Sequence, residues 1–156
     1  FHKADLISDI LGRGKSSRLY QSLVMEQGLF NNINAYITAS LDPGLLMISG
    51  NLNEGISLEK GNEAIENIVS RLVEETMQET ELEKVKNQAE ASMQFSEVDL
   101  LTRAMNLAFA ANYGDADLCN KDAERIAAIN SENFKEMAGE VLKPENCNTM
   151  YYRATK

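Results

Sequence analysis

Leu11-Gly12-Arg13-Gly14-Lys15-Ser16-Ser17-Arg18-Leu19-Tyr20 is the stretch that decides the fold, and at first sight it resembles a phosphate-binding loop. A P-loop has a glycine five positions before its Gly-Lys-Ser and follows a strand. Here Asp9 occupies that position, and its carboxylate would repel a phosphate. The preceding apolar residues recur at helical rather than strand spacing: Ala4, Leu6, Ile7, Ile10 and Leu11. The stretch therefore predicts a joint between two helices and no nucleotide site.

The glycines and serines of this joint are residue types that end and start helices. Gly12 and Gly14 are expected to end the first helix, because glycine enters the left-handed conformation of a helix end without steric cost. Ser16 or Ser17 is expected at the N-cap of the second helix, where its hydroxyl would accept a hydrogen bond from a free N–H group. This second helix spans about residues 16–27, and Gly28 is expected to end it.

The composition is that of one folded domain with an acidic surface. The 156 residues include 15 Lys and Arg against 24 Asp and Glu, a net charge of −9, and 44% of them are hydrophobic. A chain of this length builds one well-buried core, so we treat residues 1–156 as a single domain. We expect no nucleic-acid partner, because binding phosphates requires Lys and Arg. We expect no membrane partner either, since no apolar run approaches the roughly 18 residues of a membrane span.

Beyond the joint, the hydrophobic pattern first alternates and then takes helical spacing. Residues 30–53 alternate around Asp42-Pro43-Gly44 and predict an antiparallel hairpin. Helices are expected over about residues 57–77, 80–95, 97–113, 117–129 and 131–142, and a final short strand over residues 149–153. Thr80 and Glu83 are expected to form a capping box. This order predicts an α+β fold with helices packed on one face of a mostly antiparallel sheet.

No group of residues carries a catalytic or metal-binding motif. His2 is the only histidine, whereas the zinc-hydrolase motif HExxH and its inversion HxxEH each need two on one helix face. Six glutamates fall where a solvated helix face would place them: Glu74, Glu75, Glu79, Glu81, Glu83 and Glu90. Cys119 and Cys147 predict two buried or half-buried free thiols and no zinc knuckle or disulfide. We therefore expect no catalytic residue and no metal ligand.

The joint and the residues after it closely resemble the signature of a peptidase family. Residues 10–23, followed by Glu26-Gln27-Gly28-Leu29, resemble the LGxGxSSRL…L…GL signature in the C-terminal, non-catalytic half of the insulinase/pitrilysin zinc metallopeptidases. Residues 80–86 are similar to the start of a helix in the same family. The signature residues are Gly12, Gly14, Ser16, Ser17, Arg18, Leu19 and Gly28. We expect their role to be mainly structural.

The resemblance implies a half-domain that pairs with a homologous N-terminal half carrying HxxEH and zinc. The two halves of such an enzyme close around a peptide substrate, so this chain would supply chamber wall and substrate contacts and no cofactor of its own. The family half-domain starts with a strand that precedes its first helix, so we expect a piece excised from a longer chain and lacking that strand. A half-domain without its mate is expected to expose apolar surface and to form homodimers or crystal contacts through it.

Two positions depart from the family pattern. In many members of the family, this half contributes an Arg and, seven residues later, a Tyr. Both side chains reach the substrate near the metal. Aligned through Gly28 and Leu29, these positions are Val24 and Asn31, which we take as candidate substrate-facing residues. Valine donates no hydrogen bond, and asparagine lacks the phenol and its reach. This leaves two alternatives for the longer protein to which the chain would belong. It is either a peptidase that stabilises its transition state from the other half alone, or an inactive scaffold of the same fold that acts in assembly or peptide binding.

Overall fold

A computed structural model of the chain describes residues 2–38 and 44–153. Its elements are α1 (His2–Gly12), η1 (Tyr20–Glu26), β1 (Phe30–Ile37), β2 (Leu46–Leu52), α2 (Leu58–Glu74), α3 (Glu79–Ser96), α4 (Leu100–Asn112), α5 (Leu118–Ala127), α6 (Ser131–Val141) and η2 (Pro144–Asn146). Among these described residues, none of the helices combines the length and the apolar character that a membrane crossing needs.

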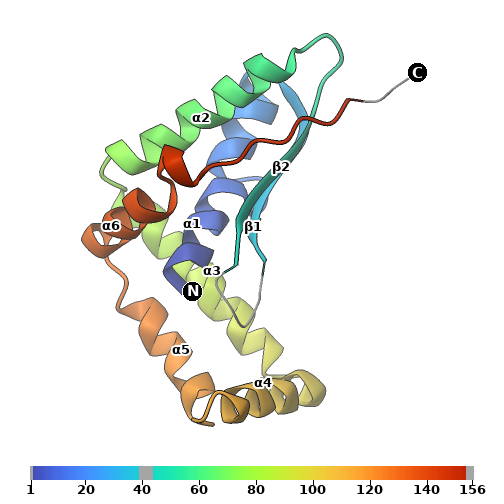
Figure 1. The fold of residues 1–156 in the computed structure, drawn as a ribbon. Coiled ribbons are helices and arrows are strands. Elements are labelled where there is room, and N and C mark those ends of the chain that lie inside the picture. Colours follow the sequence, from blue (N-terminus) through green and yellow to red (C-terminus); the bar gives the residue numbers. More distant parts are fainter. Residues whose placement is uncertain (1, 39–43, 154–156) are drawn as a thin grey trace.

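Helix α1 is the centre of the fold. It contacts both strands on one side and α3, α5 and α6 on the others (Figure 1). The side chains of Leu6, Ile7, Ile10 and Leu11 are at most 2% exposed. A helix that is covered from several directions needs an apolar face wider than that of a surface helix, and this spacing supplies it.

The hairpin forms as the alternation predicts. Strands β1 and β2 are antiparallel, with Asn34 opposite Ser49 and Tyr36 opposite Met47. Ile33 and Ala35 are buried, whereas Asn34 and Tyr36 point to the exposed face. The helices therefore cover one face of the sheet and leave the other open. The predicted turn residues Asp42 and Pro43 lie outside the described residues.

The domain is α+β with an antiparallel sheet, as expected, but it is mostly helical and its sheet is smaller than expected. The described residues form one sheet of two strands. Residues 149–153, expected as a further strand, run extended without pairing in a sheet. Their contacts are with the start of α2: Thr149 Oγ1 donates to Asn62 Oδ1 at 3.4 Å, and Arg153 lies 3.5 Å from Glu59. An alternating sequence pattern forms a strand only where another strand lies close enough to pair with it, and here the neighbouring element is helix α2.

The start of α3 also differs from the expectation. The capping box of Thr80 and Glu83 does not form, because α3 begins at Glu79 and its N-cap Gln78 makes no side-chain bond to the helix. Thr80 thus lies inside the first turn. Further along α3, Lys86 Nζ donates to the carbonyls of Ala127 and Ile129 at 2.7 and 2.8 Å, and so satisfies carbonyls at the end of α5.

Gly12 lets α1 lie directly on β1. A Cβ placed at Gly12 would be 2.6 Å from the Cβ of Ala35 and 2.6 Å from the carbonyl carbon of Asn34, closer than real Cβ atoms come to other atoms. Its φ is not positive, so the expected left-handed cap role belongs to Gly14 alone, whose φ is +77°. Glycine is therefore required at position 12 by the close approach of helix and strand.

Replacing Gly12 with alanine is expected to lower the free energy of unfolding by about 1–3 kcal/mol, because the new methyl group overpacks the contact between α1 and β1. Gly139→Ala in α6 is the matched control, since its Cβ would meet nothing nearer than Val73 Cγ1 at 4.0 Å. This control should be neutral or stabilising, because alanine is the better helix residue. Urea denaturation measures both changes. A Gly12→Ala chain as stable as the wild type would show that α1 does not press on β1.

Candidate functional site

The joint between α1 and η1 folds back on itself through one buried serine. Ser17 Oγ donates to the carbonyl of Gly14 at 2.8 Å, and the Ser17 N–H donates to the same carbonyl at 3.2 Å. The carbonyl of Ser17 accepts from the Gln21 N–H at 2.9 Å, as an N-cap carbonyl does. The hydroxyl of Ser17 thus closes the joint and does not cap a free helical N–H as expected. Ser16 is exposed.

The second helix is wider than an α-helix over most of its length. Element η1 is a π-helix from Tyr20 to Glu26, a form that is rare and recurs at functional sites. Leu23 in η1 and Leu19, which directly precedes it, are fully buried in the core. The helix ends as predicted at Gly28, whose φ is +60°, and the Leu29 N–H donates to the carbonyl of Leu23 at 2.8 Å.

Arg18 ties the joint to α3. Its Nε and Nη2 donate to the two carboxylate oxygens of Glu81 at 2.9 and 2.7 Å, and its Nη1 lies 3.8 Å from Glu75. We call this pair of hydrogen bonds between one guanidinium and one carboxylate the Arg18–Glu81 fork. The Arg18 side chain is 21% exposed, so the fork is largely removed from water. The hydrogen bonds that Arg18 donates to Glu81 raise the pKa of Arg18 above its ordinary value, against the opposite effect of burial. Of the six glutamates expected on a solvated face, Glu81 is therefore the exception, and the other five are exposed.

A second ion pair lies at the end of α1. Arg13 Nη1 is 3.0 and 3.3 Å from the carboxylate oxygens of Asp9, whose side chain is 6% exposed, and Arg13 Nη2 donates to Ser92 Oγ of α3 at 3.4 Å. Burial raises the pKa of Asp9 above its usual value by more than Arg13 lowers it. Asp9 and Arg13 border a cavity of about 20 Å³ together with Ser17 and Glu81. A space of this size holds about one water molecule, so this cavity does not admit a nucleotide.

The two candidate substrate-facing residues lie at the end of the molecule formed by η1 and the start of β1. Val24 is half-buried and packs against the core. Asn31 is exposed and sits in the irregularity between Phe30 and Asn32, where the strand register shifts. A bulge of this kind turns a side chain out of the regular alternation of the strand. The Asn31 carboxamide is therefore available to a partner, whereas Val24 is largely occupied by the core.

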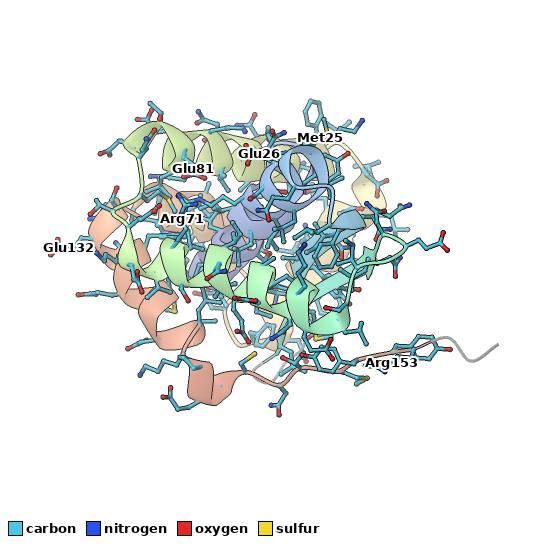
Figure 2. The ribbon with its side chains drawn as sticks, turned by 90° about the horizontal axis from the view of Figure 1, so that it is seen from above. Met25, Glu26, Arg71, Glu81, Glu132 and Arg153 are labelled. Atoms are coloured by element: carbon cyan, nitrogen blue, oxygen red, sulfur yellow. The ribbon has the colours of Figure 1, made fainter. Side chains whose placement is uncertain are left out.

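A groove of about 260 Å³ lies beside η1, against α2. Its walls include Gln27 and Leu29 on one side and Lys60, Glu63, Ile68 and Arg71 of α2 on the other. Figure 2, which views the molecule from above, shows Arg71 on α2, Glu81 on α3, and Met25 and Glu26 on η1. This groove cannot be predicted from the sequence, because no motif links η1 to a helix that starts some thirty residues later.

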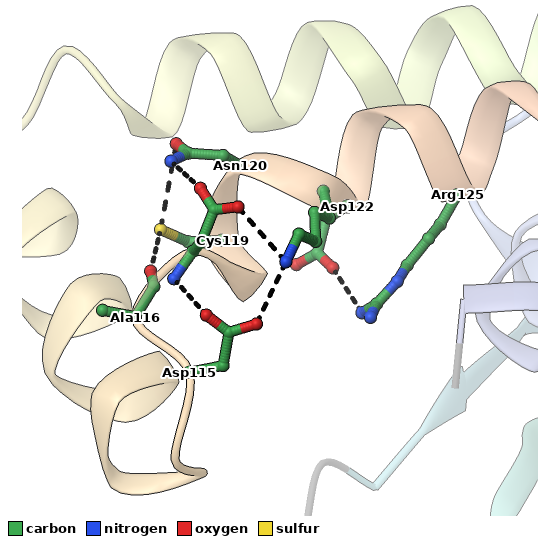
Figure 3. Close-up of polar contacts among 8 residues, drawn as sticks. Asp115, Ala116, Cys119, Asn120, Asp122 and Arg125 are labelled. Atoms are coloured by element: carbon green, nitrogen blue, oxygen red, sulfur yellow. Dashed lines mark hydrogen bonds and ion pairs between the residues drawn. The ribbon is translucent and has the colours of Figure 1, made fainter.

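The cysteines are free and do not lie in a metal site. Cys119 is half-buried, as expected, and its Sγ donates to the carbonyl of Ala116 at 3.2 Å. Beside it, Lys121 Nζ pairs with Asp115 at 3.0 Å and Asp117 at 3.2 Å (Figure 3). A hydrogen bond from Lys121 holds the pKa of the Asp115 carboxyl group below its usual range, and hydrogen bonds from Asn120 and Lys121 do the same for Asp117.

Cys147 is exposed, which corrects the expectation of burial, because it follows the Pro144 turn in a segment that leaves the core. The side chain of His2 lies outside the described residues. Within the described part of the chain, no three His, Cys, Asp or Glu side chains are grouped so that they could hold a metal ion.

Comparisons with known proteins agree with the architecture. Residues 2–89 match the family model described as Peptidase M16 inactive domain. A structure described as a "putative zinc protease" from Bordetella pertussis Tohama I aligns with a TM-score of 0.82 and 25% identity over 94% of this chain and 81% of that one. The inactive peptidase domain of a "putative zinc protease" from Bordetella parapertussis gives a TM-score of 0.84 and 25% identity over 94% and 79% of the two chains.

A protease from Helicobacter pylori shares the fold at a TM-score of 0.83 and 20% identity. The alignment covers 91% of this chain but 34% of that one, so this chain spans about a third of that protein. No curated protein sequence matches the chain.

Removing the fork with Arg18→Gln is expected to lower the free energy of unfolding by about 1–2 kcal/mol, because a half-buried charge on Glu81 loses its partner. Arg18→Lys should recover only part of this loss, since an ammonium cannot match both carboxylate oxygens. Arg71→Gln is the control: it removes an exposed pair with Glu75 and should change stability by less than about 0.5 kcal/mol. Denaturant unfolding that shows Arg18→Gln and Arg71→Gln to be equally stable would contradict the role given to Arg18.

The buried carboxyl group of Asp9 predicts a pH dependence of stability. Because its pKa is raised in the folded state, its ionised form is less favourable there than in the unfolded chain. The wild type should therefore gain stability relative to Asp9→Asn as the pH falls from about 6 to about 3, and lose that gain as the pH rises again. Urea midpoints of the two proteins across this range measure the effect. A difference that does not vary with pH would show that the Asp9 pKa is unshifted.

Proposed function

The chain belongs to the peptidase M16 family as one of its inactive domains, and from this we propose that it is the non-catalytic C-terminal domain of a zinc metalloendopeptidase. In this proposal it works beside a homologous half that carries HxxEH and the zinc ion, and both halves enclose a peptide substrate.

The family match carries this proposal, since it begins in α1 and runs through the joint and the hairpin into α3. In the chemistry of such enzymes, a zinc-bound water attacks the peptide carbonyl and a glutamate acts as base. The chain has a single histidine, so it cannot supply the two histidines of HxxEH. The proposal therefore places the zinc and the bond-breaking step in the partner half.

The contribution of this domain would be the surface formed by η1 and the start of β1. Asn31 is exposed at the bulge, and its carboxamide can both donate to and accept from the backbone of an extended peptide. Val24 offers only an apolar edge. The Arg18–Glu81 fork anchors the start of η1 to α3, so this surface is presented by a fixed helix and not by a loop. A preordered surface binds a peptide with a smaller entropy loss.

One observation favours a second function. The positions at which the family resemblance leads us to expect an Arg and a Tyr are Val24 and Asn31, so neither the guanidinium nor the phenol is available near the scissile bond. A parent protein with this pair would hold a peptide or an assembly partner without cleaving it. This alternative is an inactive scaffold of the same fold.

The proposal is tested by combining the chain with the HxxEH-bearing half from the same source and measuring cleavage of a quenched fluorescent peptide. We expect the chain alone to bind no stoichiometric zinc and to cleave nothing, and the pair to cleave. Asn31→Ala should lower kcat/KM of the pair by about 3–10-fold, the effect of one neutral hydrogen bond. Asn34→Ala, an exposed asparagine on the same strand, is the matched control and should have no effect.

Two results would overturn the proposal or redirect it. Tight stoichiometric zinc binding by the isolated chain, lost on mutating His2, Cys119 or Cys147, would place a metal site in this domain and contradict the proposal. If the pair binds a peptide without cleaving it, the scaffold function would replace the peptidase function as the explanation.

A further inference from the structure

The end of the molecule opposite η1 is an apolar arm, formed by the last turn of α3 and by α4 (residues 95–112). Six large apolar side chains of this arm are between 51% and 80% exposed: Phe95, Val98, Leu100, Leu101, Leu107 and Phe109. Within α4 only Ala110 is buried. A helix that is apolar on nearly all sides is normally covered by other parts of a protein. The arm lacks that cover in the single chain.

Helix α4, the main part of the arm, is almost free of charge, in contrast to the rest of the chain. Between residues 100 and 112 the only charged residue is Arg103, and its Nε lies 3.4 Å from Glu97. The chain as a whole has a net charge of −9. Two copies would therefore repel each other over most of their surfaces. A contact through the arm has the smallest electrostatic repulsion, because it brings the fewest like charges together. The same net charge disfavours an anionic lipid surface as the occupant.

The arrangement of side chains along α4 suits a contact between two helices. Leu101, Met105 and Phe109 stand at positions i, i+4 and i+8 and so form one stripe. Ala104 and Ala108 lie between this stripe and that of Leu100 and Leu107. Small residues between rows of large ones form the grooves into which the ridges of a second helix pack.

The exposed apolar area of the arm supplies a large part of a stable contact. At roughly 150–250 Å² per aromatic side chain, Phe95 and Phe109, which are 77% and 55% exposed, present about 200–330 Å². The four aliphatic side chains of the arm, 51% to 80% exposed, add to this area. A standard interface buries about 800 Å² on each partner, so the arm can supply the apolar centre of such an interface.

The position of the arm leaves it free when the other end of the molecule is occupied. Figure 1 shows α4 at the far end from η1 and the start of β1, with α3 and α5 leading to it. The catalytic half proposed above would face the η1 end, where Asn31 lies. The arm would then remain uncovered and needs a different occupant.

From these observations we propose that two copies of this chain associate through the apolar arm, α4 against α4 of the second copy about a twofold axis. Such a contact is isologous, so the same stripe is covered in both copies. The inference rests on the exposure, charge and shape of the arm and stands whether or not a catalytic half binds at the η1 end.

Association of this kind has a characteristic salt dependence. Added salt screens the repulsion between two acidic chains, whose interaction extends over about 10 Å at 0.1 M ionic strength. It does not weaken the burial of apolar surface. The dimer should therefore become tighter as the NaCl concentration rises, whereas a contact held by ion pairs would become weaker.

Sedimentation velocity of the full chain over a range of concentrations, at low and high NaCl, tests the proposal. We expect a reversible monomer–dimer equilibrium that shifts toward dimer at high salt. Leu101→Glu and Phe109→Glu should each raise the dissociation constant by at least about tenfold, because each places a charge in the apolar contact. Met25→Glu, at a position 64% exposed on η1, is the matched control and should leave the constant unchanged. Circular dichroism should show all three variants folded, since each replaced side chain is exposed in the monomer.

Several results would overturn the proposal. One is a wild-type chain that stays monomeric up to about 100 µM at both salt concentrations. Another is a dimer that persists unchanged in both glutamate variants of the arm. A third is a monomeric chain that floats with vesicles of phosphatidylcholine and phosphatidylglycerol, which would assign the arm to a lipid surface. None of these measurements depends on peptide cleavage, so each leaves the proposed peptidase role untouched.

Discussion

The close packing of α1 on β1 at Gly12 is the contact on which the rest of the structure depends. With no side chain at this position, the helix lies directly on the strand, and Leu6, Ile7, Ile10 and Leu11 fill the space between the sheet and three further helices. The chain must then turn immediately after Gly12. Gly14 and Ser17 make that turn, and it brings Arg18 to Glu81 of α3. The family signature thus describes one continuous set of contacts, from a helix end to a charged fork.

This set of contacts divides the molecule into two ends of different character. At one end, the fork holds η1, so that Asn31 and the groove beside α2 form a surface on fixed elements. At the other end, α3 and α5 extend to α4, whose buried area is small. Segments with few buried contacts open more readily than the core, so α4 should open more readily than α1.

Much of the fold follows from local pattern. The helical spacing before Gly12 correctly predicts a helix there, and the alternation through Ile33 and Ala35 correctly predicts the hairpin. Features that depend on distant partners escape this reasoning. The strand expected at residues 149–153 finds a helix as its neighbour, and Gly12 is glycine because of a strand some twenty residues later.

The candidate site shows the same division between local and distant signals. Gly14 and Gly28 can be assigned from sequence, because their roles depend on the local backbone. Arg18 and Glu81 are 63 residues apart in the sequence, so the sequence alone predicts Glu81 to be another solvated glutamate.

The central claim, that α1 and β1 form the most stable unit of the domain, is tested most directly by amide hydrogen exchange at a concentration where the chain is monomeric. The account predicts that residues 6–11 and 33–35 exchange only through global unfolding, while residues 100–112 exchange many-fold faster. Equally fast exchange in α1 and α4 would contradict it.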